Sequence, residues 1–192
     1  IMVNYTQEIY RKMLDSASFP GKLNNIDNIN IENNTKLLNG AIGIAITLLD
    51  QEVTFYIENY TQKDIKNIRA LTMSNQIDYR KSDYIFLDIN SEVDILQIKI
   101  GSFEYPDESA TIVHQVNDLS TYSQTKYIKL DLSGPGIKSK NSIYINGIRE
   151  EFIERLSSIN KDYPIGIDLI LVDKKGEIAF IPRSSKLSWE VL

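Results

Sequence analysis

An apolar run near the end of the sequence constrains the fold more than any other feature. Residues 167–172, Ile-Asp-Leu-Ile-Leu-Val, are apolar except for Asp168. Residues 173–176, Asp-Lys-Lys-Gly, are typical of a turn. We expect residues 177–181 to form a second strand, which Pro182 ends because proline cannot donate to a strand ladder. The sequence therefore predicts a β-hairpin.

Asp168 places a carboxylate inside the first strand of this hairpin. A buried carboxylate costs free energy unless it is paired or hydrogen-bonded. Arg183 lies just past the second strand and is a candidate partner. One interpretation is a structural salt bridge, and the other is a pair that shapes a phosphate-binding or protein-contact site.

Helix and strand patterns alternate along the rest of the chain. Apolar spacing predicts helices over residues 6–17, 35–49 and 148–160. A further helix is expected to begin after a capping-box-like sequence at Thr61 and Asp64. Ser91 is expected to cap a short helix. Strands are expected at residues 53–57, 84–87, 110–116, 126–132 and 142–146. Glycine costs a helix about 1 kcal/mol relative to alanine, so Gly40 and Gly43 either weaken the second helix or allow close packing.

This order of elements predicts one domain over residues 1–192. Strands separated by helices favour a layered α/β architecture in which helices cover a central sheet. The hairpin makes that sheet mixed rather than purely parallel. We find no linker, internal repeat or low-complexity tract that would divide the chain.

Charge and hydropathy limit the kinds of partner. The formal net charge is −5 and the pI is about 5.0. Nucleic acids and anionic membranes favour a basic face, so neither is expected as a partner. No apolar run approaches the ~20 residues needed to cross a bilayer, and the N-terminal residues lack a secretory-signal pattern. We expect a cytoplasmic protein.

Few residues are suited to catalysis or metal binding. The chain has no cysteine and one histidine, His114, which excludes thiolate, zinc–cysteine and iron–sulfur chemistry and leaves no expected metal site. His114 follows an apolar strand pattern without a triad, so we favour a strand-end or partly buried histidine over a catalytic one. No P-loop, Gly-x-Gly-x-x-Gly or Gly-x-Ser-x-Gly sequence is present.

A loop with two glycines is a second candidate site. Ser133, Gly134 and Gly136 lie close to Lys138, so backbone N–H groups could approach an anion there. The alternative is a tight turn between strands. Arg11, one helix face away from a Pro-Gly turn at residues 20–21, is a third candidate, again with a structural alternative.

Four segments together carry a family resemblance. Residues 163–171 contain the pattern Pro-x-Gly-Ile-Asp-Leu-Ile-Leu, and residues 181–185 read Ile-Pro-Arg-Ser-Ser. Residues 10–21 are expected to form a helix that ends in Pro-Gly, and residues 132–137 read Leu-Ser-Gly-Pro-Gly-Ile. The fourth segment, residues 105–111, matches more weakly. In this order they resemble PhnH, a subunit family of the bacterial carbon–phosphorus lyase system. Two departures are Ala17, where the family tends to have methionine, and Ser184-Ser185 in place of two threonines.

The family resemblance implies a fold, partners and a reaction that the residues alone do not indicate. It implies a three-layer α/β/α sandwich with a mixed sheet, similar to the large domain of pyridoxal-phosphate-dependent transferases but without a cofactor. It implies a homodimer that works with the PhnG, PhnI, PhnJ and PhnL subunits. It also implies a reaction in which ATP and an alkylphosphonate give an α-D-ribose 1-alkylphosphonate 5-triphosphate and adenine.

Two functions therefore stand as hypotheses. In the first, the chain is an accessory subunit of that transferase, with Asp168, Arg183, the loop at residues 133–136 and Arg11 as candidates for binding substrate or partner and no catalytic residue assigned. In the second, it is a non-catalytic scaffold or dimerisation subunit that docks through an exposed sheet edge or the C-terminal tail. A stand-alone pyridoxal-phosphate protein is a third alternative, which we do not expect.

Overall fold

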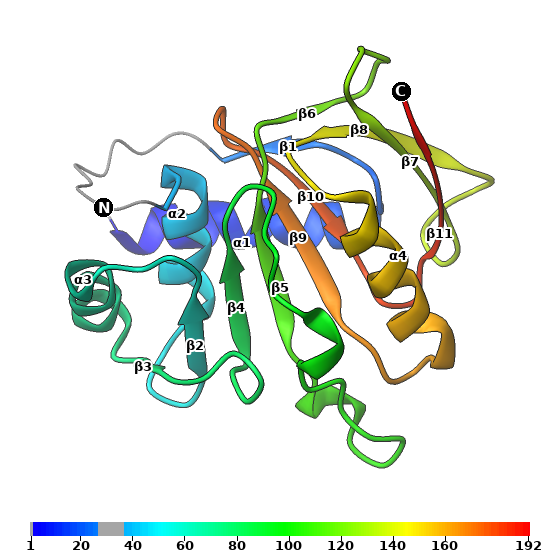
Figure 1. The fold of residues 1–192 in the computed structure, drawn as a ribbon. Helices are drawn as coiled ribbons and strands as arrows, with labels where there is room; N and C mark the ends of the chain where they lie inside the picture. Colours follow the sequence, from blue (N-terminus) through cyan, green and yellow to red (C-terminus); the bar gives the residue numbers. More distant parts are fainter. Residues whose placement is uncertain (1, 27–36) are drawn as a thin grey trace.

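A mixed sheet forms the centre of the protein. The structure, a computed structural model, describes residues 2–26 and 37–192, apart from the side chains of residues 2 and 3. The strands of this sheet are β1 (Asn24–Asn25), β2 (Thr54–Ile57), β3 (Asn75–Gln76), β4 (Tyr84–Leu87), β5 (Thr111–Gln115), β9 (Asp168–Val172) and β10 (Glu177–Ile181). The seven strands lie in the order β1-β10-β9-β5-β4-β2-β3 (Figure 1). Strands β3, β2, β4, β5 and β9 are parallel, whereas β10 and β1 pair antiparallel, so the sheet is mixed as predicted.

A second, antiparallel sheet was not predicted. Its strands are β6 (Asp118–Ser120), β7 (Ile128–Ser133), β8 (Asn141–Asn146) and β11 (Lys186–Val191). These four strands lie in the order β11-β7-β8-β6. The sequence predicted strands near β7 and β8 but gave no sign of β11, whose partner β7 lies more than fifty residues earlier in the chain.

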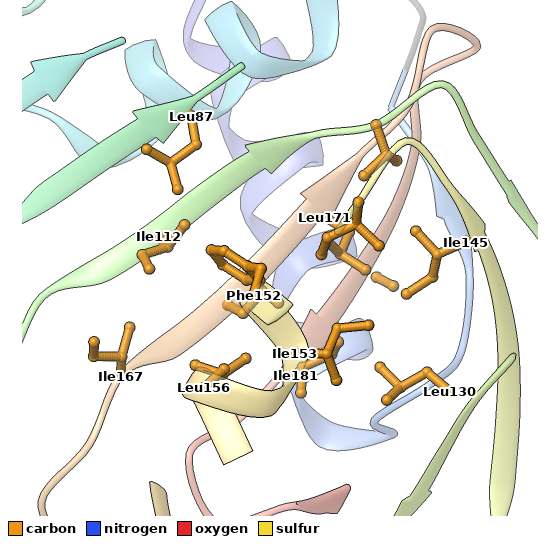
Figure 2. Packing of buried hydrophobic residues seen from close by; sticks show 14 of the residues in the cluster. Leu87, Ile112, Leu130, Ile145, Phe152, Ile153, Leu156, Ile167, Leu171 and Ile181 are labelled. Atoms are coloured by element: carbon orange, nitrogen blue, oxygen red, sulfur yellow. The ribbon is translucent and has the colours of Figure 1, made fainter. Parts of the chain in front are cut away.

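Helices and the second sheet cover the two faces of the central sheet. The helices are α1 (Met2–Ser18), α2 (Asn39–Leu48), α3 (Gln62–Thr72) and α4 (Glu150–Ile159), with short 3-10 turns η1 (Ile95–Gln97), η2 (Pro106–Glu108) and η3 (Asn160–Asp162). On one face, α1, α2 and α3 enclose a core with β4, β5 and β9. On the other face, α4 and the second sheet share the covering layer (Figure 2). None of the helices in the described ranges has the length and apolar character to cross a bilayer.

The expected α/β/α sandwich is therefore only partly correct. Three layers are present, but one outer layer consists of α4 together with four strands rather than of helices alone. The reason is area, because a single ten-residue helix cannot cover one face of a seven-stranded sheet. The inward residues of the second sheet, Leu130, Leu132, Ile143 and Ile145, complete that core.

Strand β9 shows why the apolar run is continuous. Leu169 and Leu171 pack in the core under α4, whereas Ile170 and Val172 pack in the core under α1 and α2. A strand that is buried on both faces loses the alternation of apolar and polar residues. The run at residues 167–172 is thus a central strand, as the hairpin prediction required.

The hairpin turn is held by a buried aspartate. The Asp173 carboxylate accepts hydrogen bonds from the backbone N–H of Lys175 at 2.7 Å and of Glu177 at 2.9 Å. It also accepts from the N–H of Leu119 at 3.1 Å, which ties the turn to the second sheet. Burial raises the pKa of Asp173, although the three backbone donors act in the opposite direction.

Several local predictions are confirmed and others are wrong. The capping box at Thr61 and Asp64 is formed in both directions. The predicted helix over residues 6–17 is present within α1, yet Leu14, which helical spacing places on the same face as Tyr10, is 55% exposed rather than buried. Ser91 caps no helix, because the only helical turn nearby begins after Asp94. The proposed cap at residue 35 lies outside the described residues.

The two glycines of α2 allow close packing. A Cβ atom on Gly40 would lie 2.7 Å from Cγ2 of Val172, which is completely buried. A Cβ atom on Gly43 would lie 2.6 Å from the hydroxyl of Tyr5 on α1. Of the two alternatives raised by the sequence, close packing is the one observed.

We predict that Gly40→Ala destabilises the protein despite the better helix propensity of alanine. The clash with Val172 costs more than the propensity gain, so we expect a net loss of about 1–2 kcal/mol in the free energy of unfolding. Urea denaturation measures this loss. Lys66→Ala on the exposed side of α3 is the control and should change stability by less than about 0.5 kcal/mol, because lysine and alanine have similar helix propensities. Equal stability of the Gly40 variant and wild type would contradict the packing role.

His114 is more deeply buried than predicted. Its side chain lies in β5 with no exposed surface, and its ring packs edge-on against Phe152 with ring centres 4.8 Å apart. Nδ1 lies 2.8 Å from the carbonyl oxygen of Gln115, whereas Nε2 has no partner among the described residues. Desolvation by burial lowers the pKa of His114 from 6.5 to about 4, despite the opposing bond to Gln115.

We predict that His114 makes the protein less stable in mild acid. Because the unfolded chain takes up a proton near pH 6.5 and the folded protein only near pH 4, the stability present above pH 6.5 is lost as pH falls through this window. Between pH 7 and pH 5, wild type should lose about 2 kcal/mol more unfolding free energy than His114→Leu. Urea denaturation at the two pH values tests this, and parallel losses in both proteins would refute it.

Candidate functional site

Asp168 and Arg183 meet as the sequence predicted. Asp168 begins β9, and Arg183 follows the end of β10, its antiparallel neighbour. The Asp168 carboxylate accepts hydrogen bonds from Nη2 of Arg183 at 2.5 Å, from Nε at 3.2 Å and from the backbone N–H at 2.8 Å. The Arg183 side chain is only 15% exposed, so most of this pair is removed from solvent.

The Arg183 guanidinium has little capacity left for a ligand. Its Nη1 donates to the carbonyl oxygen of Pro106 at 2.7 Å, which ties the hairpin to η2. Together with the bonds to Asp168, three of its five N–H donors are engaged within the protein. This geometry favours the structural interpretation of the pair, because the fork that would grip an anion already holds a carboxylate.

The glycine loop lies beside the segment that follows Arg183. Ser133 pairs with Lys186 in the register of β7 and β11. A Cβ atom on Gly134 (φ +131°) would lie 3.1 Å from the carbonyl oxygen of Ser184. Gly136 (φ +79°) approaches the carbonyl oxygen of Ser18 at the end of α1 even more closely, at 2.5 Å for a Cβ atom. The end of α1, the glycine loop and the segment after Arg183, which are distant in sequence, therefore lie close together.

This loop is a turn between strands rather than an open anion cradle. It connects β7 to β8, and the N–H of Ile137 donates to the carbonyl oxygen of Gly134 at 3.1 Å. The glycines are required by positive φ and by contact with neighbouring backbone. Arg11 lies elsewhere, exposed on α1, and makes no hydrogen bond or ion pair with the described residues.

A cleft opens on one side of Arg183. Its volume is about 560 Å³, and it lies between the end of α4 with η3 on one side and residues 183–187 on the other. Lys161, Lys186 and several serines line it. A smaller hollow of about 320 Å³ lies across Arg183, beside Pro106 and Pro164. Neither Lys161 nor Lys186 stands out in the sequence, because an isolated lysine in a loop or strand carries no recognisable pattern.

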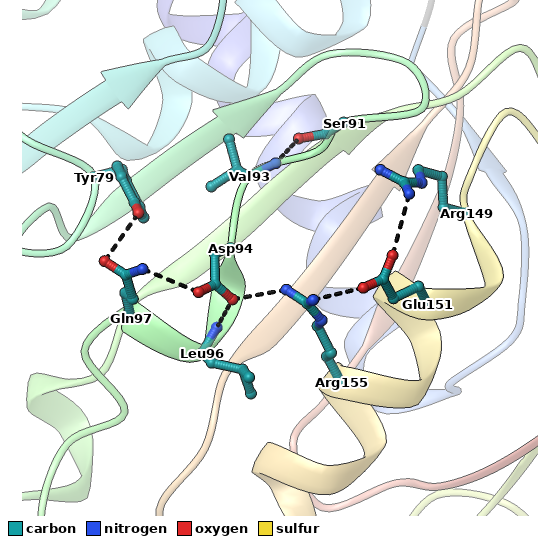
Figure 3. Close-up of polar contacts among 9 residues, drawn as sticks. All are labelled: Tyr79, Ser91, Val93, Asp94, Leu96, Gln97, Arg149, Glu151 and Arg155. Atoms are coloured by element: carbon teal, nitrogen blue, oxygen red, sulfur yellow. Dashed lines mark hydrogen bonds and ion pairs between the residues drawn. The ribbon is translucent and has the colours of Figure 1, made fainter.

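A second polar hollow, of about 230 Å³, lies at the start of α4. Figure 3 shows its ion pairs, in which Glu151 bridges Arg149 and Arg155, and Arg155 also reaches Asp94 at 2.7 Å. Arg149 further pairs with Glu92 at 3.2 Å. These ion pairs connect residues 91–97 to α4. Because each of the two arginines is already paired, the hollow offers no free charge to a ligand.

The described residues contain no group of three or more His, Cys, Asp or Glu side chains placed to hold a metal ion. Among the three depressions described above, the cleft is the one with lysine ammonium groups outside the ion pairs of the described residues, those of Lys161 and Lys186. With the neighbouring serine hydroxyls they suit the binding of an anion, although the carboxylate of Glu154 also lines the cleft.

Comparisons with known proteins support the family resemblance. The model of the bacterial phosphonate metabolism protein family PhnH matches residues 1–188. The chain is 23% identical over 188 residues to HtxG of Stutzerimonas stutzeri, named as a C-P lyase subunit, with 95% of this chain and 85% of HtxG covered. It is 26% identical over 188 residues to the alpha-D-ribose 1-methylphosphonate 5-triphosphate synthase subunit PhnH of Rhizobium meliloti (strain 1021), with 96% of this chain and 90% of that subunit covered.

The chain is thus an α/β protein of the kind that works in phosphonate metabolism. It belongs to the PhnH family, because the family model spans nearly its whole length. The resemblance seen in the hairpin, the glycine loop and the N-terminal helix is confirmed.

We predict a strong energetic coupling between Asp168 and Arg183. Removal of either partner leaves the other largely buried and unpaired, so a double-mutant cycle with Asp168→Ala and Arg183→Ala should give an interaction free energy of about 1–3 kcal/mol. The exposed pair of Glu151 and Arg155 on α4 is the control and should give less than about 1 kcal/mol. Denaturation of the four variants of each cycle measures both values. A coupling at Asp168 no larger than that at Glu151 would show that the pair does not hold the hairpin end.

Proposed function

We propose that this chain is an accessory subunit of an alpha-D-ribose 1-methylphosphonate 5-triphosphate synthase within a carbon–phosphorus lyase system. The observation that carries the proposal is the match to the PhnH family over residues 1–188. The name of the Rhizobium meliloti relative supports the particular reaction. In that reaction a phosphonate oxygen bonds to the anomeric carbon of ATP, the bond from that carbon to adenine breaks, and adenine leaves with a proton.

The side chains of the described residues support an accessory rather than an independent catalytic role. The reaction needs a cationic grip on the triphosphate, an acid for the departing base and stabilisation of a positively charged sugar. His114, the one imidazole, is completely buried, and Arg183 is held by Asp168. We therefore assign the main chemistry to partner subunits, with PhnG, PhnI, PhnJ and PhnL as the expected ones in the cytoplasm.

A role for Arg183 remains part of the proposal. Arg183 lines both the cleft and the smaller hollow, and two of its five side-chain N–H donors have no partner among the described residues. We propose that Arg183, positioned by Asp168, supplies one hydrogen bond at the edge of a substrate or partner, with the loop at residues 133–136 nearby. A likeness to the large domain of pyridoxal-phosphate transferases is part of the same family-based proposal and implies no cofactor here.

A scaffold or dimerisation subunit is the second candidate function. It is favoured by an apolar groove of about 140 Å³ formed by α1, α2 and the central sheet, whose lining includes Tyr10 and Leu14. Both side chains are more than half exposed, at 53% and 55%. Exposed large apolar side chains on one helix face are typical of surfaces that contact another chain.

Reconstitution of the synthase separates the two functions. We predict that omission of this subunit lowers phosphonate-dependent adenine release by the assembled complex, and that Arg183→Ala lowers it severalfold in a subunit that still folds. The measurement is adenine release with ATP and methylphosphonate, with circular dichroism of the variant as a folding check. If assembly of the complex requires the subunit but the rate of adenine release does not, the scaffold function is favoured.

A further inference from the structure

The cleft beside Arg183 is a gap within one layer of the fold. The outer layer on this face consists of α4 and the second sheet, and β11 is the edge strand of that sheet. At one end α4 and β11 are joined, since Nε1 of Trp189 donates to Glu150 at 3.1 Å. Toward the other end lies the cleft, lined by residues of α4 and η3 and by the beginning of β11. Its volume of about 560 Å³ is within the range of small-molecule sites.

Two lysines on different elements give the cleft an unbalanced positive charge. Lys161 comes from η3 and Lys186 from β11, and neither forms an ion pair within the described ranges. Arg183 adds no net charge, because Asp168 neutralises it. The lining also includes the carboxylate of Glu154, which is exposed and unpaired among the described residues.

Hydroxyl groups surround these two ammonium groups. Ser157, Ser158 and Ser184 line the cleft, and their hydroxyl groups make no hydrogen bond within the described part of the chain. Ser185 also lines it, is 6% exposed, and has a buried hydroxyl without any partner in the described part of the chain. The hydroxyl of Ser185 is closed off from solvent, whereas the hydroxyls of the other three serines are donors that a bound anion would engage.

An exposed ring completes the lining. Tyr163 is 63% exposed and borders both the cleft and the smaller hollow. Ammonium and hydroxyl donors beside an aromatic ring suit a ligand that has an anionic head and a ring-shaped body. The Arg149 and Arg155 hollow differs in this respect, because its cations are already paired with carboxylates.

We infer that this cleft binds a tetrahedral phosphorus oxyanion of a small molecule, with Lys161 and Lys186 as the charged contacts and the hydroxyls of Ser157, Ser158 and Ser184 as donors. The oxyanion belongs either to a polyphosphate tail or to a phosphonate, since both present the same oxygens to these groups. The choice of these two sources rests on the proposed function, whereas the cleft and its charge do not. Arg183 lines the cleft beside these groups and is itself held by Asp168.

Calorimetric titration of the full chain with tripolyphosphate and, separately, with methylphosphonate tests this site. We expect at least one probe to bind, and Lys161→Gln/Lys186→Gln to bind it at least about tenfold more weakly. Lys66→Gln is the matched control, because Lys66 is an exposed lysine on α3 that is also unpaired among the described residues. Glu154→Gln should act in the opposite direction and tighten binding.

Each outcome of the titrations either supports the proposed oxyanion site or overturns it. Binding of tripolyphosphate alone assigns the cleft to a polyphosphate tail, binding of methylphosphonate alone assigns it to a phosphonate, and both results support the site. Failure of both probes to bind overturns it, as does equal weakening by Lys66→Gln, which would show only diffuse attraction to charge. These measurements need no partner subunit, so their failure is distinct from a finding that the subunit is dispensable for adenine release.

Discussion

The burial of strand β9 on both faces is the constraint on which the rest of the structure depends. Its side chains alternate between two cores, with Leu171 under α4 and Ile170 under α1 and α2. A strand with two apolar faces needs a covering layer on each side. It can begin with the carboxylate of Asp168 only because Arg183 crosses from the neighbouring strand to pair with it.

The same layering creates the polar cleft. One helix and one small sheet share an outer layer, and they do not fill the space between α4 and the start of β11. The segment that leaves β10 passes through this place, beside Gly134 and close to the end of α1. A structural ion pair and the cleft proposed to bind an oxyanion are therefore neighbours, and Arg183 takes part in both.

Much of the fold was predictable where contacts are local. The hairpin, the capping box at Thr61 and the helix α4 each depend on residues within about ten positions of one another. Predictions failed where the outcome depends on a distant neighbour. Leu14 has a helical spacing that predicts burial, yet no element covers it in the described structure. Strand β11 was not predicted, because its six residues are exposed or half-buried and form a strand by pairing with β7, more than fifty residues earlier in the chain.

The sequence by itself determined the family, the mixed sheet and the pairing of Asp168 with Arg183, because these follow from ordered motifs and from neighbouring strands joined by a short turn. Only the tertiary structure decided which charges remain unpaired. It placed Lys161 and Lys186 on the lining of one cleft and engaged the Arg183 donors within the protein. Whether a charge is free depends on every element packed around it, and that information is not contained in any local stretch of residues.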